Sequence, residues 1–240
     1  RYYAPIEVRE YGARQLYGHG FRALVVYQRI GLRMTYSNIA EAITEQFNEA
    51  DIYRYVSFII KDAGQFYQDT EDSIIKKLLE SDVIHADETP INIRGTTQYV
   101  WTFTNDKYVV FKLSKTREAT TAHEFLKSFK GILISDFYAG YDAIQCVQQK
   151  CWVHLIRELN DDLWDSPFDI EFENLVSMIR ALMVPIMESV QKYGLKRRHL
   201  FKFMKQVDRF YEKAIVNKDY KSELAIKYQR RFIKHKDNLF

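Results

Sequence analysis

The chain has little of what marks several protein classes. Among its 240 residues are two cysteines, four prolines and nine glycines. Two cysteines exclude a disulfide scaffold and favour a reducing cytosol, and so few prolines and glycines exclude a long flexible linker. No run approaches the roughly 18 apolar residues of a membrane span, and no secretory segment opens the chain. Since the chain begins at Arg1, we expect a fragment or a trimmed product.

The composition is that of a globular protein, with 47% hydrophobic and 28% charged residues. The formal net charge of +3 hides an asymmetry. Residues 190–240 contain 15 Lys and Arg against 5 Asp and Glu, whereas residues 1–189 contain 20 against 27. A basic C-terminal part on an acidic body indicates a polyanionic partner at one end. A solvated helical face would produce the same charge pattern.

Residues 1–81 are expected to form a helical DNA-binding region. Ser37 is expected to cap one helix, and a break at residues 48–51 separates it from the next. Two short helices around a tight break suit a helix-turn-helix motif, with Arg54 and Lys61 of the second helix as DNA contacts. A small packing subdomain would have the same pattern.

Residues 82–164 change to the period of β-strands. We expect a strand at residues 83–87 that ends on an acid, followed by a hairpin of two strands at residues 99–104 and 108–113. A helix is expected at residues 120–129 and a second strand ending on an acid at residues 132–136. A last strand is possible at residues 150–153. This order predicts an α/β fold, in which a mixed sheet combines an antiparallel hairpin with parallel additions.

Residues 165–240 return to a helical period. One helix is expected over residues 171–193, with an interruption at Pro185. Phe201, Phe203 and Phe210 are expected in the core. A row of cations binds phosphates without reading sequence, and the candidates for such contacts are Lys196, Arg197, Arg198, Lys202, Lys205 and Arg209.

Asp87 and Asp136 stand out because each follows a continuous apolar strand. The carboxyl ends of such strands are where α/β proteins place ligands, and two neighbouring carboxylates repel unless a cation lies between them. Mg²⁺ prefers carboxylate oxygens and can support phosphoryl transfer on a nucleic acid. Acids at strand ends also cap loops, so this alternative stays open. Glu88 points to the opposite face from Asp87 and is expected at the surface or behind the site.

Four segments carry a resemblance to a known family. They are residues 85–90 (HADETP), 94–101 (RGTTQYVW), 135–142 (SDFYAGYD) and 151–157 (CWVHLIR). Each segment alone is modest, but the ordered set resembles the transposases of the IS-sixty-six (IS66) group of insertion sequences. That group is similar to the wider DDE transposases, so the resemblance implies an RNase H-like core with acids on the first and fourth strands.

By this resemblance, Asp87 and Asp136 look like the first two acids of the catalytic triad, which would hold Mg²⁺ or Mn²⁺. The third acid of the family is a Glu that follows a long helical insertion, and its motif is not found before Phe240. A two-ion site is therefore expected only with that missing acid. Glu171 is a weak rival for the third position because no supporting motif surrounds it.

His154 belongs to a Cys-x-x-His pair that recurs after the second acid in several DDE groups, so the resemblance places it beside the active site. Arg157 follows one helical turn later and is a plausible phosphate contact. A structural His and a surface Arg are the alternative. Cys146, Cys151 and His154 would make three zinc ligands of the four required, with no obvious fourth.

The resemblance implies a DNA transposase that cuts at the element ends and transfers the strand to target DNA. It also implies a homo-oligomer in the synaptic complex, possible accessory proteins, and a prokaryotic, nucleoid-associated location in the cytoplasm, with no membrane partner. Two alternatives remain. The chain could be a truncated, inactive remnant that only binds DNA, or an RNase H-like nuclease that cuts without strand transfer.

Overall fold

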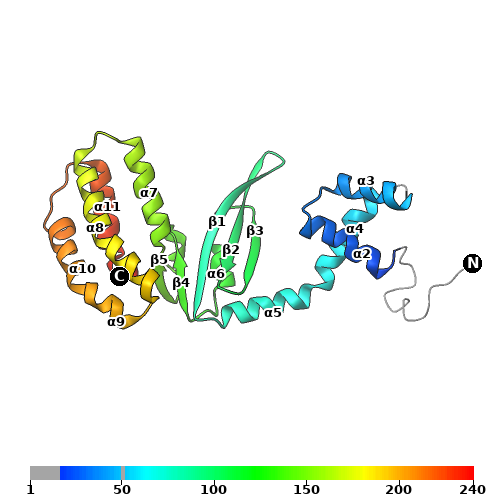
Figure 1. Ribbon diagram of the computed structural model, residues 1–240, viewed down its shortest axis with the longest axis horizontal. Helices are drawn as coiled ribbons and strands as arrows, with labels where there is room; N and C mark the ends of the chain where they lie inside the picture. The colour runs from blue at the N-terminus through cyan, green and yellow to red at the C-terminus, as the bar shows by residue number, and fades with distance from the viewer. Residues whose placement is uncertain (1–16, 50–51) are drawn as a thin grey trace, which may run out of the picture. The chain divides into compact units, whose positions relative to one another are not determined.

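The computed structural model describes residues 17–49 and 52–240. The chain divides into two compact units, residues 1–75 and residues 76–240, and Figure 1 traces the elements of both. Of the expected break at residues 48–51, Asn48 and Glu49 are described. Asn48 ends a helix in the left-handed conformation, with φ of 53°, whereas Asp51 lies outside the described residues.

The described part of the first unit is helical, as predicted. Its elements are α2 (His19–Val26), the π-helical turn η1 (Tyr27–Gly31), α3 (Tyr36–Phe47), α4 (Tyr53–Phe66) and the start of α5 (Gln68–Leu79), which runs into the second unit. α2, α3 and α4 pack around one apolar core that includes Val25, Ile39, Ile43, Val56 and Ile59.

The predicted helix cap at Ser37 is wrong. Thr35 is the N-cap of α3, and its Oγ1 accepts a hydrogen bond from the backbone N of Asn38 at 3.2 Å. The backbone of Thr35 is extended, with φ of −71° and ψ of 159°, which is the conformation a capping residue needs. Ser37 lies inside the first turn, where its own backbone is already helical.

The second unit contains the predicted mixed sheet. Its strands are β1 (Val83–Ile93), β2 (Thr96–Thr104), β3 (Val109–Ser114), β4 (Ile132–Ser135) and β5 (Val147–Lys150), in the order β3-β2-β1-β4-β5. β1–β2 and β2–β3 are antiparallel, whereas β1–β4 and β4–β5 are parallel. This arrangement confirms the α/β, RNase H-like fold class.

Two strand boundaries differ from the prediction. β1 continues to Ile93, so Asp87 lies inside the strand and not at its end. The cause is a long hairpin with β2, closed by Arg94 and Gly95 with φ of 53° and 81°, the positive values that a type I′ turn requires. At the other edge, β5 ends at Lys150, because α7 (Trp152–Asp165) begins where the strand was expected.

One face of the sheet is covered by α6 (Thr120–Phe125) and the residues after it. The rings of Phe125 and Phe103 stack at 4.0 Å, and Phe129 is buried beyond the end of α6, which is shorter than the predicted helix of residues 120–129. Gly131 precedes β4, and a Cβ there would lie 2.4 Å from the carbonyl O of Asp82. The glycine therefore permits the close approach of β4 to the start of β1.

The helices after β5 form a second apolar core. They are α7, α8 (Ile170–Tyr193), α9 (Arg197–Leu200), η3 (Phe201–Phe203), α10 (Met204–Phe210), η4 (Tyr211–Val216), α11 (Glu223–Lys234) and α12 (Lys236–Leu239). Figure 1 shows α7 to α11 on the β5 side of the sheet.

Two expectations for this region are wrong. α8 runs through Pro185 without a break. Its buried apolar residues, from Phe172 to Met183, anchor it in the core before the proline, and Ile186 packs against the same core after it, which offsets the lost backbone hydrogen bond. Phe203 and Phe210 are buried as predicted, but Phe201 is 65% exposed, since η3 turns it outward. In the described residues, no helix combines the length and the apolar character that crossing a bilayer would take.

Candidate active site

The parallel pairing of β1 and β4 brings the two candidate acids together. His85 pairs with Ile134 as the last pair of this ladder. Asp87 and Asp136 each follow two residues later, Asp136 just past the end of β4, so the register predicts that they are neighbours. Alternate strand residues share a face, and neighbouring strands lie about 4.8 Å apart, so the register favours both carboxylates on one side of the sheet. Both also act on the buried phenol of Tyr141. Burial raises its pKa most, followed by the charges of Glu88, Asp136 and Asp87.

His154 reaches the same place from α7. Its Nε2 lies 3.8 Å from Oδ1 of Asp87, which is an ion pair when the imidazole is protonated. The side chain of Asp87 is 52% exposed and that of His154 is 29% exposed, so the pair opens to solvent. Nδ1 of His154 is buried and has no hydrogen-bond partner among the described residues. Nε2 is therefore the ring nitrogen that lies near Asp87, and the position of His154 beside an active site stays a prediction.

Asp136 is held by its own local turn. Its Oδ1 accepts a hydrogen bond from the backbone N of Tyr138 at 2.9 Å, and its backbone carbonyl accepts one from the buried ammonium of Lys150 at 3.1 Å. Oδ1 of Asp87 accepts one from the backbone N of Glu88 at 3.0 Å. Each carboxylate thus has one oxygen engaged by a nearby backbone N–H.

Glu88 lies on the opposite face, as the strand period predicts, and its side chain is only 2% exposed, so the surface alternative is wrong. One carboxylate oxygen accepts hydrogen bonds from Nε and Nη2 of Arg117 at 3.0 and 2.7 Å, and the other accepts one from the hydroxyl of Tyr141 at 2.9 Å. Arg117 also lies over the ring of Tyr138 at 4.7 Å. A buried and fully bonded layer therefore supports the strand that carries Asp87.

Sequence reasoning missed Arg117, Tyr141 and Lys150 as neighbours of the acids. Tyr141 stands inside the matched segment at residues 135–142, which was the available signal for it. Arg117 lies in a loop and Lys150 ends a strand, and no local pattern marks either residue.

Arg157 is exposed near His154, whereas Glu171 is hydrogen-bonded within the helical region. Arg157 is exposed on α7, one turn after His154, so it lies on the helix face that reaches Asp87. Glu171 lies in the first turn of α8, where its Oε2 accepts a hydrogen bond from the backbone N of Lys221 at 2.7 Å and a second one from that of Ser222. This carboxylate tethers the start of α11, which is a structural task within the helical region.

The candidate DNA contacts are all exposed. On α4, Arg54 and Lys61 are two turns apart and share one face with Phe58, which is 61% exposed. The other cations surround the α9–α10 segment and comprise Lys196, Arg197, Arg198, Lys202, Lys205 and Arg209.

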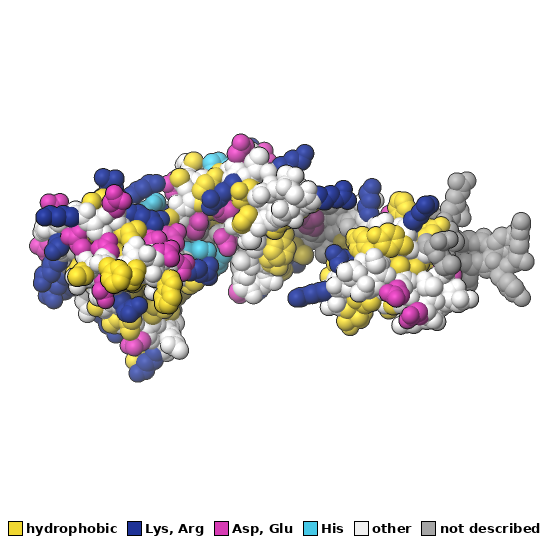
Figure 2. Space-filling model, turned by 90° about the horizontal axis from the view of Figure 1, so that it is seen from above, with side chains coloured by type: hydrophobic (Ala, Val, Ile, Leu, Met, Phe, Trp, Pro, Cys, Tyr) yellow, Lys and Arg dark blue, Asp and Glu magenta, His cyan; other side chains and the backbone are white. Residues whose placement is uncertain are grey.

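The cations of the α9–α10 segment act on one another. Desolvation and the charges of Arg198, Lys202 and Lys196 lower the pKa of His199. The charge is nevertheless not uniform over the helical region, because Figure 2 shows Lys and Arg mixed with Asp and Glu on the visible face.

The donor set suits a hard divalent cation in part. Carboxylate oxygens are what Mg²⁺ prefers, and Asp87 on β1 and Asp136 just after β4 supply them. Within residues 17–49 and 52–240, however, no group of three or more His, Cys, Asp or Glu side chains gathers in a metal-binding arrangement. Cys146 and Cys151 are free thiols. The acids present thus fit one side of an ion and leave the other side to further ligands.

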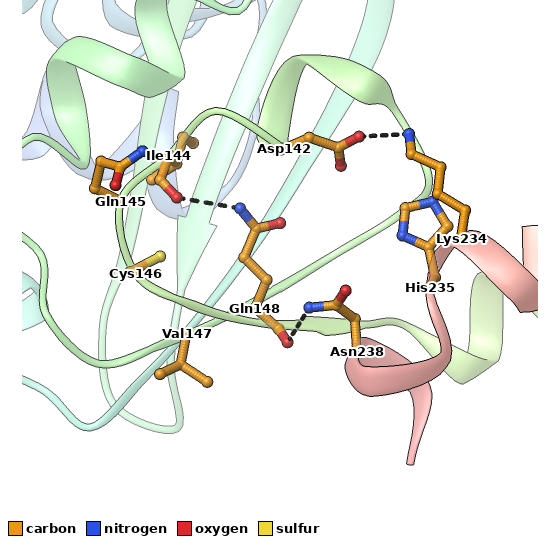
Figure 3. A pocket seen from close by; sticks show the side chains of 9 residues that line it. All are labelled: Asp142, Ile144, Gln145, Cys146, Val147, Gln148, Lys234, His235 and Asn238. Carbon is orange, nitrogen blue, oxygen red and sulfur yellow. Dashed lines mark hydrogen bonds and ion pairs between the residues drawn. The ribbon is translucent and has the colours of Figure 1, made fainter.

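An open pocket of about 630 Å³ lies beside this region, between the segment leading into β5 and the end of α11 (Figure 3). Its lining includes Asp142, Gln148, Lys234, His235 and Asn238. Asp142 and Lys234 are bonded to each other at 2.7 Å, so the strongest charges in the pocket wall already neutralise one another.

Comparisons with known proteins give one specific result. A search of curated proteins found no match. Among solved structures, a chain of the simian T-cell lymphotropic virus intasome in complex with PP2A regulatory subunit B56 gamma aligns at 12% identity over 38% of this chain and 44% of that one, with a TM-score of 0.27. The HTLV-2 integrase catalytic core domain in complex with magnesium aligns at 10% identity over 38% of this chain and 77% of that one, with a TM-score of 0.26.

The family comparison covers nearly the whole chain. The model of the transposase IS66 family matches residues 14–240, a range that includes all four segments on which the resemblance rests. The chain belongs to the IS66 family of transposases.

Proposed function

We propose that this chain carries two carboxylates of a DDE-type site that cuts and joins DNA strands. The observation that carries the proposal is the parallel register of β1 and β4, whose last pair, His85 and Ile134, lies two residues before Asp87 and Asp136. A divalent Mg²⁺ or Mn²⁺ ion held by these two residues would activate a nucleophile and offset charge on a phosphodiester. The carboxylates would orient the ion and supply the negative charge that holds it.

The reaction we propose has two steps of the same chemical kind. Water attacks a phosphorus at the element end, and the bond to the 3′ oxygen breaks to leave a 3′-hydroxyl. This hydroxyl then attacks a phosphodiester of target DNA, where one P–O bond forms and another breaks. We propose that His154 orients Asp87 or donates to a phosphate oxygen, and that Arg157 binds a neighbouring phosphate.

A third carboxylate would complete the site. The backbone carbonyl of Leu239 accepts hydrogen bonds from Nε1 of Trp152 at 2.9 Å and from Nε2 of Gln149 at 3.3 Å. Residues 238–240 thus lie where β5 passes into α7, the helix that carries His154. With two acids alone, we expect weak binding of a single ion.

Mn²⁺ binding by calorimetry tests the metal assignment. We expect the Asp87→Ala and Asp136→Asn variants each to lose Mn²⁺ binding, while the exposed Asp161→Asn control on α7 retains it. Equal Mn²⁺ binding by the wild-type chain and all three variants would refute the assignment of Asp87 and Asp136 as metal ligands. Absence of binding already in the wild-type chain would favour the DNA-binding remnant instead.

We further propose that DNA is bound through the exposed cations of α4 and of the α9–α10 segment. Arg54 and Lys61 flank an exposed aromatic ring on one helix face, which suits a helix that meets nucleic acid. The slope of log K against log salt reports the number of phosphates neutralised. Replacing Lys202 and Lys205 with Gln is expected to reduce that slope by about two, whereas replacing Lys76, which pairs with Glu80 at 4.0 Å, leaves it unchanged.

The remaining expectations follow from family membership. We propose that element-end and target DNA are the partners, that the synaptic complex is a homo-oligomer, and that accessory proteins take part. Strand-transfer products, in addition to cleavage products, would distinguish the transposase from a nuclease that only cuts.

A further inference from the structure

Lys150 ends β5, and its side chain is 1% exposed. Its Nζ lies 3.1 Å from the backbone O of Asp136, 3.4 Å from Oγ of Ser135 and 3.3 Å from Oδ1 of Asp142. An ammonium has three N–H donors, so these three acceptors satisfy it fully. A buried charge is costly unless it is paired and hydrogen-bonded, so this arrangement accounts for a lysine in the interior.

Two of the three acceptors belong to the end of β4. Ser135 pairs with Lys150 as the last residue pair of the β4–β5 ladder, and Asp136 is the first residue beyond that pairing. No strand hydrogen bond of the ladder therefore holds Asp136 in place. The carbonyl of Asp136 is held instead by the Lys150 ammonium and by the hydroxyl of Ser135, each of which donates to it at 3.1 Å.

The third acceptor connects this strand end to α11. Figure 3 shows Asp142 bonded to Lys234, and the distance from its Oδ2 to Nζ of Lys234 is 2.7 Å. Burial by itself would raise the pKa of Asp142, but hydrogen bonds and charge from Lys234 and Lys150 lower it overall. Asp142 is therefore an anion that bridges two lysines, one in the sheet and one in the helical region.

We infer that Lys150 is a positioning residue that aims the Asp136 carboxylate toward Asp87, and that the bridge from Asp142 to Lys234 couples this hold to α11. The inference rests on the proposed function, because Lys150 acts through Asp136.

Charge and geometry predict opposite outcomes at this site. A lysine near two carboxylates repels a cation, so its removal would tighten Mn²⁺ binding if charge were its main effect. A positioning lysine has the reverse effect, since its loss frees Asp136 to turn away from the ion. The sign of the change in Mn²⁺ affinity therefore separates the two roles.

Amide hydrogen exchange measures how firmly Asp136 is kept in position, and it needs no bound metal. The Tyr138 amide donates to Oδ1 of Asp136 at 2.9 Å, and the Phe172 amide makes the same kind of bond to Oδ1 of Asp169 at 2.9 Å. Lys150→Met is expected to speed exchange at Tyr138 at least about tenfold relative to Phe172. Lys150→Arg keeps the charge and is expected to have a smaller effect.

The control is Lys227→Met, which removes a lysine paired with Asp162 at 2.7 Å on the helical region and is expected to leave the exchange ratio unchanged. An unchanged ratio in Lys150→Met would overturn the inference. If Lys150→Met fails to fold, Asp142→Asn provides the same test with the lysine in place, and a rise in the Tyr138 ratio is again expected.

Calorimetry with Mn²⁺ then connects the hold to the proposed site. The Kd of Lys150→Met is expected to rise by about tenfold, the lower end of what loss of an outer-shell partner costs a metal site. A tighter or unchanged Kd would overturn the positioning role toward the ion. Accelerated exchange at Tyr138 together with no Mn²⁺ binding by the wild-type chain would support the hold on Asp136 and refute the proposed metal site.

Discussion

Removal of the Arg117 guanidinium tests the buried layer behind the acids. The side chain of Glu88 is 2% exposed, whereas that of Arg117 is 51% exposed. Removing one partner of a fully buried ion pair costs roughly 3–5 kcal/mol. Because half of the Arg117 side chain already faces water, we expect a loss of about 2 kcal/mol for Arg117→Met, in the range of hydrogen bonds to charged groups. Tyr141→Phe removes a single hydrogen bond, which is worth about 1 kcal/mol.

Tryptophan fluorescence during urea unfolding is the assay. The three tryptophans of the chain, at positions 101, 152 and 164, all lie in the second unit, so the signal reports residues 76–240. Trp101 is fully buried, and its ring lies 5.9 Å from that of Tyr141. The free energy of unfolding from this signal therefore follows the part of the sheet that the mutation disturbs.

A double mutant identifies the cause. If the penalty comes from an unpaired buried carboxylate, Glu88→Gln in the Arg117→Met background restores about 1 kcal/mol, because it removes the charge that lost its partner. A loss below about 0.5 kcal/mol in Arg117→Met, which is typical of exposed ion pairs, would refute this reasoning. So would a double mutant that is no more stable than Arg117→Met alone.

Three further predictions concern single contacts. Thr35→Ala is expected to destabilise α3 by about 1 kcal/mol because it removes the N-cap. The control Ser37→Ala is expected to change the stability by no more than about 0.5 kcal/mol. Hydrogen exchange of the Asn38 amide measures both effects. Gly131→Ala is expected to lower the melting temperature, because the new Cβ would lie 2.4 Å from Asp82. Gly64→Ala on α4 is expected to raise the melting temperature, because a Cβ there meets open space. A change of the same sign in both variants would contradict these two predictions. The lowered pKa of Asp142 adds stability that is present above its unfolded value of about 3.8 and is lost as the pH falls through the lower folded value. Asp142→Asn should therefore flatten the acid side of the stability profile, and identical acid profiles would contradict the bridge.

Element type was predictable because it depends on neighbours in the chain. The alternating and continuous apolar runs at residues 99–104 and 132–135 identified β2 and β4, and the Asn105 turn signal between β2 and β3 is real: its Oδ1 accepts hydrogen bonds from the backbone N of Lys107 and of Tyr108. Boundaries were less predictable. β1 extends past Asp87 because β2 pairs with it along its length. No residue within β1 indicates from the sequence that β2 is its partner.

The face of a residue follows from strand period, but its burial does not. The period alone placed Glu88 opposite Asp87. Whether that opposite side is solvent or interior depends on α6 and on Tyr141, which lies 53 residues further along the chain. The same holds for Arg117, 29 residues from Glu88. A periodic pattern contains no information on which element covers a face.

The sequence by itself determined the family, the helical and strand segments and the two acids that stand out in them, because these features are local or lie in ordered segments. The tertiary structure alone decided that the strands before Asp87 and Asp136 pair in parallel, that His154 reaches Asp87, and that Lys150 is buried against the end of β4. These contacts join residues that are distant in the chain. They depend on how the sheet and helices pack, which is a collective property of the fold and not of any one segment.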